Sequence, residues 1–189
     1  EKWIELINRY LKINKGMKVL DLGCGPGFFS VMLTNLGCQV IGIDYSDKML
    51  EEARNNARKF KANVEFQKMD VQDLAFQDEI FDLIITRNVT WNLEKPVQAY
   101  QEMVRVLKKQ GHLLNIDGNH YYHYQDQDYS RAGHSDHQHM EGIDVSIIDN
   151  IAKELKLSYV LRPQYDIEIL KEIGFQQIES EILSKEKTK

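Results

Sequence analysis

An acid and three glycines occupy alternate positions of one short segment with the pattern D-x-G-x-G-x-G: Asp21, Gly23, Gly25 and Gly27. Glycine adopts positive φ freely and has no Cβ to hold a ligand away, so this loop can turn sharply against a bound molecule. A helix predicted from Phe28 would point its free N–H groups at that molecule, which favours a carboxylate or a phosphate. Asp21 would repel a phosphate and attract an ammonium group. The loop therefore suits a ligand that carries both an amino group and a carboxylate.

The spacing of the glycines separates two kinds of nucleotide site. A dinucleotide fingerprint has the pattern G-x-G-x-x-G after its strand, and this segment does not follow it. The acid and the glycines resemble the first motif of the class I S-adenosylmethionine (SAM) dependent methyltransferases, in the branch that methylates small molecules. The resemblance implies that SAM is the cofactor, that S-adenosyl-L-homocysteine is the product, and that the loop from Asp21 to Gly27, with Cys24, binds the cofactor. A glycine-rich turn without a ligand is the alternative.

A second acid, Asp44, ends a predicted apolar strand at residues 39–43. An acid about 20 residues beyond a glycine loop, at the tip of the second parallel strand, can accept hydrogen bonds from both ribose hydroxyls of a nucleoside. Asp44 is therefore predicted to bind the cofactor. The alternative is that it caps the helix predicted to start near Asp47, a role that Ser46 could also fill.

Four residues are expected near the adenine of such a cofactor: Tyr45, Met49, Asp70 and Val71. The resemblance implies that Tyr45 lies against the base, with Met49 one helical turn further along, although both would also suit a core. Asp70 follows a predicted strand at residues 64–69. The resemblance implies that its carboxylate accepts a hydrogen bond from the amino group of the adenine. The backbone N–H of Val71 would then bind a ring nitrogen. An acid at a strand end is common, so a purely structural role for Asp70 stays open.

The segment after the fourth predicted strand, residues 81–86, contributes Arg87 and Asn88 to the predicted cofactor site. Trp91 follows three residues later, and an indole beside an amide could form one wall of a substrate pocket. Trp91 could equally anchor the loop. Because ligands of parallel sheets bind beyond the carboxyl ends of the strands, all these residues are expected to converge at one edge.

Alternating strands and helices are expected to bring these residues to the carboxyl edge of the sheet. Apolar periodicity predicts strands at residues 17–22, 39–43, 64–69, 81–86 and 112–116, and helices at 3–11, 28–36, 47–60, 96–107, 145–155 and 165–173. Such alternation predicts an α/β fold, a three-layer doubly wound, mostly parallel sheet of the Rossmann-like methyltransferase type with helices on both faces. Residues 175–183 are predicted as a sixth strand. Gly37 is expected to end the second helix in the C′ position.

Residues 118–142 break the pattern and hold five of the six histidines. A segment of this length after the fifth strand is expected to act as a lid over the methyl donor. His120 and Asn88 are the candidates for catalysis, His120 because an imidazole near its ordinary pKa suits a general base. His134, His137 and His139 have spacing that could bind a divalent metal, but close histidines in an acid-rich loop are more often solvated, so no metal is predicted.

Composition limits the class of protein. At 189 residues the chain is predicted to form one domain, and 42% hydrophobic with 28% charged residues is ordinary for a globular protein. A net charge of −5 argues against nucleic acid as a partner. Two cysteines without metal-ligand spacing, with no signal-peptide pattern and no apolar run of membrane-spanning length, suit a cytoplasmic protein.

These observations predict a single-domain SAM-dependent methyltransferase, over residues 1–189, that moves the sulfonium methyl group to a small-molecule acceptor by in-line displacement. Two rivals remain. A nucleic-acid methylase would need a basic stripe that the sequence does not display. A SAM-binding regulatory subunit without catalytic activity would bind the cofactor but would methylate no acceptor.

Overall fold

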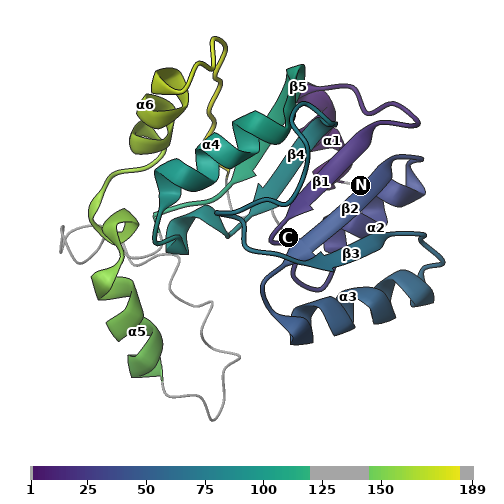
Figure 1. Cartoon of the computed structure of the whole chain (residues 1–189), viewed down its shortest axis with the longest axis horizontal. Coiled ribbons are helices and arrows are strands. Elements are labelled where there is room, and N and C mark those ends of the chain that lie inside the picture. Colours follow the sequence, from purple (N-terminus) through teal and green to yellow (C-terminus); the bar gives the residue numbers. More distant parts are fainter. Residues whose placement is uncertain (1, 120–144, 184–189) are drawn as a thin grey trace.

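The computed structural model describes residues 2–119 and 145–183, with a parallel sheet at the centre (Figure 1). Its five strands are β1 (Lys18–Leu22), β2 (Gln39–Asp44), β3 (Glu65–Lys68), β4 (Phe81–Arg87) and β5 (Leu107–Ile116). They lie in the order β3-β2-β1-β4-β5, and every neighbouring pair is parallel. The chain runs outward from β1 in both directions, so the order reverses between β1 and β4. The predicted doubly wound fold is confirmed.

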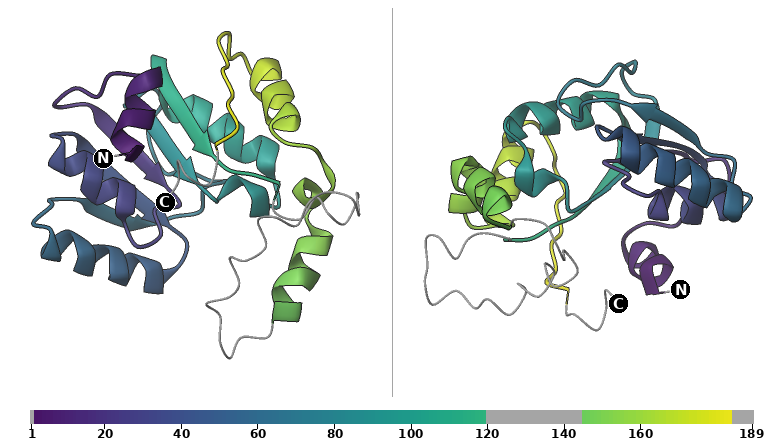
Figure 2. Two further views of the ribbon diagram at one scale, coloured as in Figure 1. Left: turned by 180° about the vertical axis from the view of Figure 1, so that it is seen from behind. Right: turned by 90° about the horizontal axis from the view of Figure 1, so that it is seen from below.

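Helices cover both faces of this sheet. The helices described are α1 (Lys2–Tyr10), α2 (Phe28–Asn35), α3 (Asp47–Lys59), α4 (Pro96–Val106), α5 (Val145–Glu154) and α6 (Gln164–Glu172), with short 3₁₀ turns η1 (Thr90–Asn92) and η4 (Lys156–Tyr159). Of these, α5 lies away from the sheet (Figure 1). Figure 2 shows α1 and α2 on the face opposite to α4. Alternate residues of β1 supply the two cores, because Val19 packs in the cluster under α1 and α2 while Leu20 and Leu22 pack in the cluster under α4. None of the helices described is long and apolar enough to cross a membrane.

The end of α2 places β2 directly beside the glycine loop. Gly37 has φ 93°, and its N–H donates to the carbonyl of Thr34 while the N–H of Cys38 donates to the carbonyl of Leu33. This pair of bonds closes the helix in a Schellman motif, as predicted for Gly37. The turn is short, so β2 starts at once and ends at Asp44 beside the loop that begins α2.

Gly42, in the middle of β2, leaves no room for a side chain. A Cβ there would lie 2.8 Å from a ring carbon of Phe66 and 2.8 Å from the hydroxyl oxygen of Ser30. We expect Gly42→Ala to lower the free energy of unfolding by about 1 to 3 kcal/mol, the usual cost of overpacking a core. Urea unfolding checks this, with Gly118→Ala as control because a Cβ at Gly118 would meet no atom within 4 Å. Equal stabilities of the two variants would contradict it.

The fifth strand differs from the prediction at its start. The sequence predicts a helix to residue 107 and a strand from His112, but β5 begins at Leu107, directly after α4. Leu107 pairs with Phe81 and His112 with Leu83, so the register shifts between these two pairs. The buried Leu107 side chain holds the first pair in place, and the residues between are accommodated as an irregularity of the strand.

The predicted sixth strand at residues 175–183 is wrong: the segment is described without strand pairing. Its side chains hold it instead. Phe175 packs against the core under α4, and the Glu181 carboxylate accepts two hydrogen bonds of 2.9 Å from the Arg9 guanidinium and one from the Tyr10 hydroxyl. Figure 2 shows this segment running past β5 after α6, which is followed by Gly174 at φ 108°. The apolar residues of this segment indicate burial, but they do not reveal whether its backbone finds a partner strand.

Candidate active site

The glycine loop has the backbone that its composition predicts, with φ of 68° at Gly23, 52° at Gly25 and 82° at Gly27. The three glycines differ in what surrounds them. A Cβ on Gly23 would lie 2.3 Å from the Val89 side chain, and one on Gly27 would lie 3.1 Å from the Ala53 side chain. These two glycines therefore let those side chains pack directly against the backbone of the loop. A Cβ on Gly25 would meet no atom within 4 Å. Gly25 therefore faces open space, which a ligand can enter against bare backbone.

Asp21 lies under the first turn of α2. Its side chain is almost fully buried, and one carboxylate oxygen accepts the Ser30 N–H at 2.8 Å and the Ser30 hydroxyl at 2.5 Å. It thus satisfies a free N–H of the helix, the role that a capping side chain usually fills. Burial raises the pKa of Asp21 to about 6, with the Ser30 hydrogen bonds acting in the opposite direction. A cation beside this carboxylate would favour its charged form.

Stability should therefore depend on pH through Asp21. Its pKa of about 6 exceeds the usual 3.8, so the folded protein holds the Asp21 proton more tightly than the unfolded chain. The stabilisation of the folded state that comes from this proton is complete below pH 3.8 and is lost as the pH rises through about 6. We expect the free energy of unfolding of Asp21→Asn, which cannot ionise, to rise relative to that of the wild type by about 2 to 3 kcal/mol between pH 4 and pH 8. Urea unfolding from pH 4 to pH 8 measures it, and a constant difference between the two proteins would contradict it.

Asp44 connects the end of β2 to the glycine loop. One carboxylate oxygen accepts the Gly25 N–H at 2.9 Å and the other accepts the Ser46 N–H at 2.9 Å. The cap of α3 is Ser46, whose hydroxyl oxygen accepts the Met49 N–H. Each Asp44 oxygen has a further lone pair, so the half-buried carboxylate can still accept hydroxyl groups. The sequence did not indicate the bond from Gly25, which aligns the acid with the open loop.

The residues predicted near an adenine lie around the ends of β2 and β3. The ring of Tyr45 is 73% exposed, with the Lys68 ammonium 5.9 Å from its centroid, while Met49 is half-buried on α3. Asp70 accepts the Gln72 N–H at 2.8 Å. The side chain of Val71 is buried in the core under α4. An exposed aromatic ring beside a half-buried acid leaves surface on which a base can stack.

The turn after β4, at residues 88–92, is bonded to the end of β5 and within itself. Asn88 has φ 55° and donates its N–H to the carbonyl of Ile116, while its carbonyl accepts the Trp91 indole N–H at 3.0 Å. Trp91 therefore anchors the turn, one of the two roles predicted for it. Arg87 extends toward α1, with its guanidinium 5.0 Å from the centroid of Trp3.

A buried polar cluster next to this turn was missed by the sequence analysis. Arg162, Asp117 and Asp166 have side chains that are 3%, 2% and 9% exposed, and the guanidinium lies within 3.2 Å of both acids. The i, i+4 spacing of Arg162 and Asp166 was a usable signal for one ion pair. Nothing in the sequence links either residue to Asp117, which ends the fifth strand.

Part of what the sequence predicts falls outside the described residues. This applies to most of the predicted lid and to the histidines His120, His134, His137 and His139. Within residues 2–119 and 145–183 no three acids, histidines or cysteines are grouped as a metal site. Cys24 is buried, and burial raises the pKa of its thiol, which disfavours a nucleophilic thiolate.

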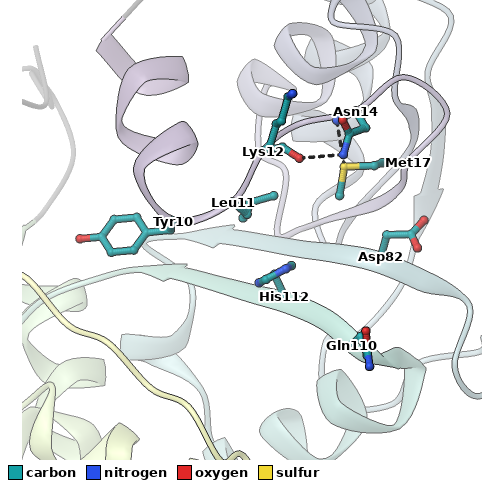
Figure 3. Close-up of a pocket in the computed structure, with 8 residues that line it drawn as sticks. All are labelled: Tyr10, Leu11, Lys12, Asn14, Met17, Asp82, Gln110 and His112. Carbon is teal, nitrogen blue, oxygen red and sulfur yellow. Dashed lines mark hydrogen bonds between the residues drawn. The ribbon is translucent and has the colours of Figure 1, made fainter.

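A cavity of about 470 Å³ lies near the start of strands β1 and β4, at the opposite end of these strands from the glycine loop (Figure 3). It is lined by residues that include Met17 before β1, Asp82 at the start of β4 and His112 in β5. None of the residues predicted to bind the cofactor lines it. By the rule for parallel sheets, the candidate active site is the carboxyl edge instead, where Asp21, Gly25 and Asp44 meet.

Comparisons with known proteins agree on one family. A family model described as methyltransferase domain matches residues 13–173. Ubiquinone biosynthesis O-methyltransferase from Coxiella burnetii (strain Dugway 5J108-111) is 30% identical over 100 residues, which are 53% of this chain and 43% of that protein. Demethylmenaquinone methyltransferase from Listeria welshimeri is 32% identical over 120 residues, which are 61% of this chain and 51% of that protein.

A solved structure extends the likeness of the fold to most of the chain. The crystal structure of a SAM-dependent methyltransferase from Aquifex aeolicus superposes with a TM-score of 0.65 at 22% identity, over 91% of this chain and 79% of that one. The chain spans about half the length of the curated relatives described above. The matched segment of the family model includes the glycine loop, Asp44 and the turn after β4.

Proposed function

We propose, because the chain belongs to the methyltransferase domain family, that it transfers a methyl group from SAM to a small-molecule acceptor. The observation that carries this proposal is the open space at Gly25, whose N–H donates to the half-buried acid Asp44 and whose loop follows the buried acid Asp21. A glycine backbone without side chains, the N-terminal end of α2 and two acids at one strand edge suit a ligand with a carboxylate, an ammonium group and ribose hydroxyls. SAM has all three.

The glycine loop would hold the amino-acid end of SAM. Gly23, Cys24, Gly25 and Gly27 supply a backbone path that a side chain at Gly25 would block, and the start of α2 favours a carboxylate. Asp21 would face the ammonium group, directly or through water, and its charged form would be favoured by that cation. Binding should then strengthen as the pH rises through the raised pKa of Asp21.

The nucleoside end would lie along β2 and β3. Asp44 would accept the ribose hydroxyls with the lone pairs that Gly25 and Ser46 leave available. Asp70 and the backbone of Val71 would hold the edge of the adenine, and Tyr45 with Met49 would cover its face. Arg87 and Asn88 would border the site at the end of β4.

SAM supplies a methyl group on a positively charged sulfur, which already makes that carbon electrophilic. The protein therefore contributes mainly by holding the acceptor close to the methyl group and in line with it. A general base is needed only where the acceptor must lose a proton, and His120, in the lid proposed for residues 118–142, is the candidate together with Asn88. The curated relatives are named for quinone compounds, so hydroxylated aromatic rings are the first acceptor class to test.

Calorimetric titration tests the proposed cofactor. The purified chain is titrated separately with SAM, S-adenosylhomocysteine and NADH, and then incubated with radiolabelled SAM and a catechol. We expect micromolar binding of the first two compounds, no binding of NADH, and transfer of label to an acceptor of this class. Binding of NADH alone would overturn the proposal, and binding of SAM without transfer to any small molecule would favour a regulatory role.

A further inference from the structure

Residues 88–92, here called the post-β4 turn, lie at the carboxyl end of β4, where the strand order reverses. Thr90 is the innermost residue of this turn, with no exposed surface. Its hydroxyl donates to an Asp117 carboxylate oxygen at 2.7 Å and accepts from the Arg162 guanidinium at 2.5 Å and from the Asn115 amide at 3.1 Å. One hydroxyl thus joins the turn to β5 and to the C-terminal part of the chain, and its hydrogen-bonding capacity is filled.

Arg162 is the centre of these contacts. It precedes α6 and forms a two-pronged pair with Asp166, at 2.7 Å from Nε and 2.9 Å from Nη2. Its third nitrogen lies 3.2 Å from the Asp117 oxygen that accepts the Trp91 N–H at 2.9 Å. Only a planar guanidinium can reach two acids and a hydroxyl at once in fixed directions, since an ammonium has a single charged point.

The segment that carries Arg162 is attached to the same edge on its other side. The Arg162 N–H donates to the side-chain oxygen of Asn119 and its carbonyl accepts the Asn119 amide, both at 2.8 Å. The Tyr100 hydroxyl on α4 donates to Asp166 at 2.7 Å and accepts from Asn115 at 2.9 Å. Arg162 is therefore itself held in place, which a positioning group requires.

We propose that Arg162 is a positioning residue that fixes the post-β4 turn at the edge where the methyl acceptor would lie. That this positioning serves methyl transfer rests on the proposed function. That Arg162 fixes the turn does not depend on it. Through Thr90 and Asp117 the guanidinium holds both the side chain and the backbone of the turn, and Trp91 and Asn88 are held with it.

Trp91 reports on the turn directly. The chain has only two tryptophans, so Trp3→Phe leaves Trp91 as the single indole fluorophore. In that background we expect Arg162→Gln to raise the acrylamide quenching constant of Trp91 by about twofold or more at temperatures well below unfolding, because a turn without its contacts opens locally.

Arg105 provides a matched control for a general loss of stability. Its guanidinium also pairs with two acids, Asp78 and Glu102, each at 2.7 Å, and those contacts do not include the post-β4 turn. Arg105→Gln should leave the quenching of Trp91 at the wild-type value. Equal quenching in the Arg162 and Arg105 variants would overturn the proposal.

A second pair of variants decides the matter if Arg162→Gln does not fold. Thr90→Val keeps the shape of the side chain and removes the hydroxyl, while Thr90→Ser keeps the hydroxyl. We expect raised Trp91 quenching in the valine variant and wild-type quenching in the serine variant, and the same quenching in both would overturn the proposal. The wild type is titrated with SAM alongside, so that an absence of SAM binding counts against the proposed function while the quenching comparison still stands.

Discussion

Replacing Gly25 with valine is expected to weaken SAM binding at least about 100-fold, equal to about 3 kcal/mol, while the protein remains folded. The side chain would enter the open space above the loop, where a Cβ on Gly25 meets no atom within 4 Å. The folded protein therefore tolerates its volume and a ligand does not. Calorimetric titration with SAM measures the loss, and circular dichroism shows whether the fold survives.

Backbone strain needs its own control, because valine at φ 52° costs of order 1 to 3 kcal/mol whatever surrounds it. Gly16 offers one. It has φ 83°, a Cβ there also meets no atom within 4 Å, and it lies before β1, at the other end of that strand from the glycine loop. Gly16→Val should be destabilised to a similar degree and should bind SAM as the wild type does. If both variants lost binding equally, the open space above Gly25 would not be the cofactor site.

Removing the carboxylate of Asp44 is the second large effect. We expect Asp44→Ala to weaken SAM binding by about 1 to 3 kcal/mol, or roughly 5- to 150-fold, because the ribose hydroxyls would lose an acceptor. The variant also frees the N–H groups of Gly25 and Ser46, which the carboxylate holds at 2.9 Å in the folded protein. The lost acceptor and the freed N–H groups both weaken SAM binding. The loss of binding free energy should therefore lie in the upper part of that range, at about 2 kcal/mol or more.

A neighbouring acid serves as the control. Asp47 lies in the first turn of α3 with its side chain 76% exposed, and it pairs with Lys68. Asp47→Ala removes the same charge three residues away and should leave the dissociation constant for SAM unchanged within about twofold, since exposed pairs contribute little. An unchanged affinity in Asp44→Ala, or an equal loss in Asp47→Ala, would remove Asp44 from the proposed site.

The carboxyl edge was predictable from the sequence because apolar strands mark where each acid must lie. Asp21 and Asp44 each stand near the end of such a strand, and parallel strands bring those ends together. The internal partners of these acids were not predictable. The bonds from Ser30 to Asp21 and from Gly25 to Asp44 depend on how the loop folds back on the strands, which a pattern of residue types does not encode.

Contacts between distant segments account for the remaining differences. The sequence predicted a strand at residues 175–183, whereas this segment is attached to α1 by Glu181 and pairs with no strand of the described residues. Arg162 stood in a predicted connection between helices, with no sign that Asp117 and Thr90 would receive it. Periodicity reports which face of an element is buried, whereas the partner across the core is set by the whole fold.

The position of β4 beside β1 has a consequence for folding kinetics. Lys18 and Asp82, joined by a hydrogen bond at the start of these two strands, are 64 positions apart in the sequence. Strands β1, β2 and β3 are connected by single helices or short loops, so they can associate early, whereas closing the long loop to β4 costs more chain entropy. The two sides of the candidate site meet only at that later step. A chain emerging from the ribosome would therefore carry its glycine loop well before it could hold an acceptor beside it.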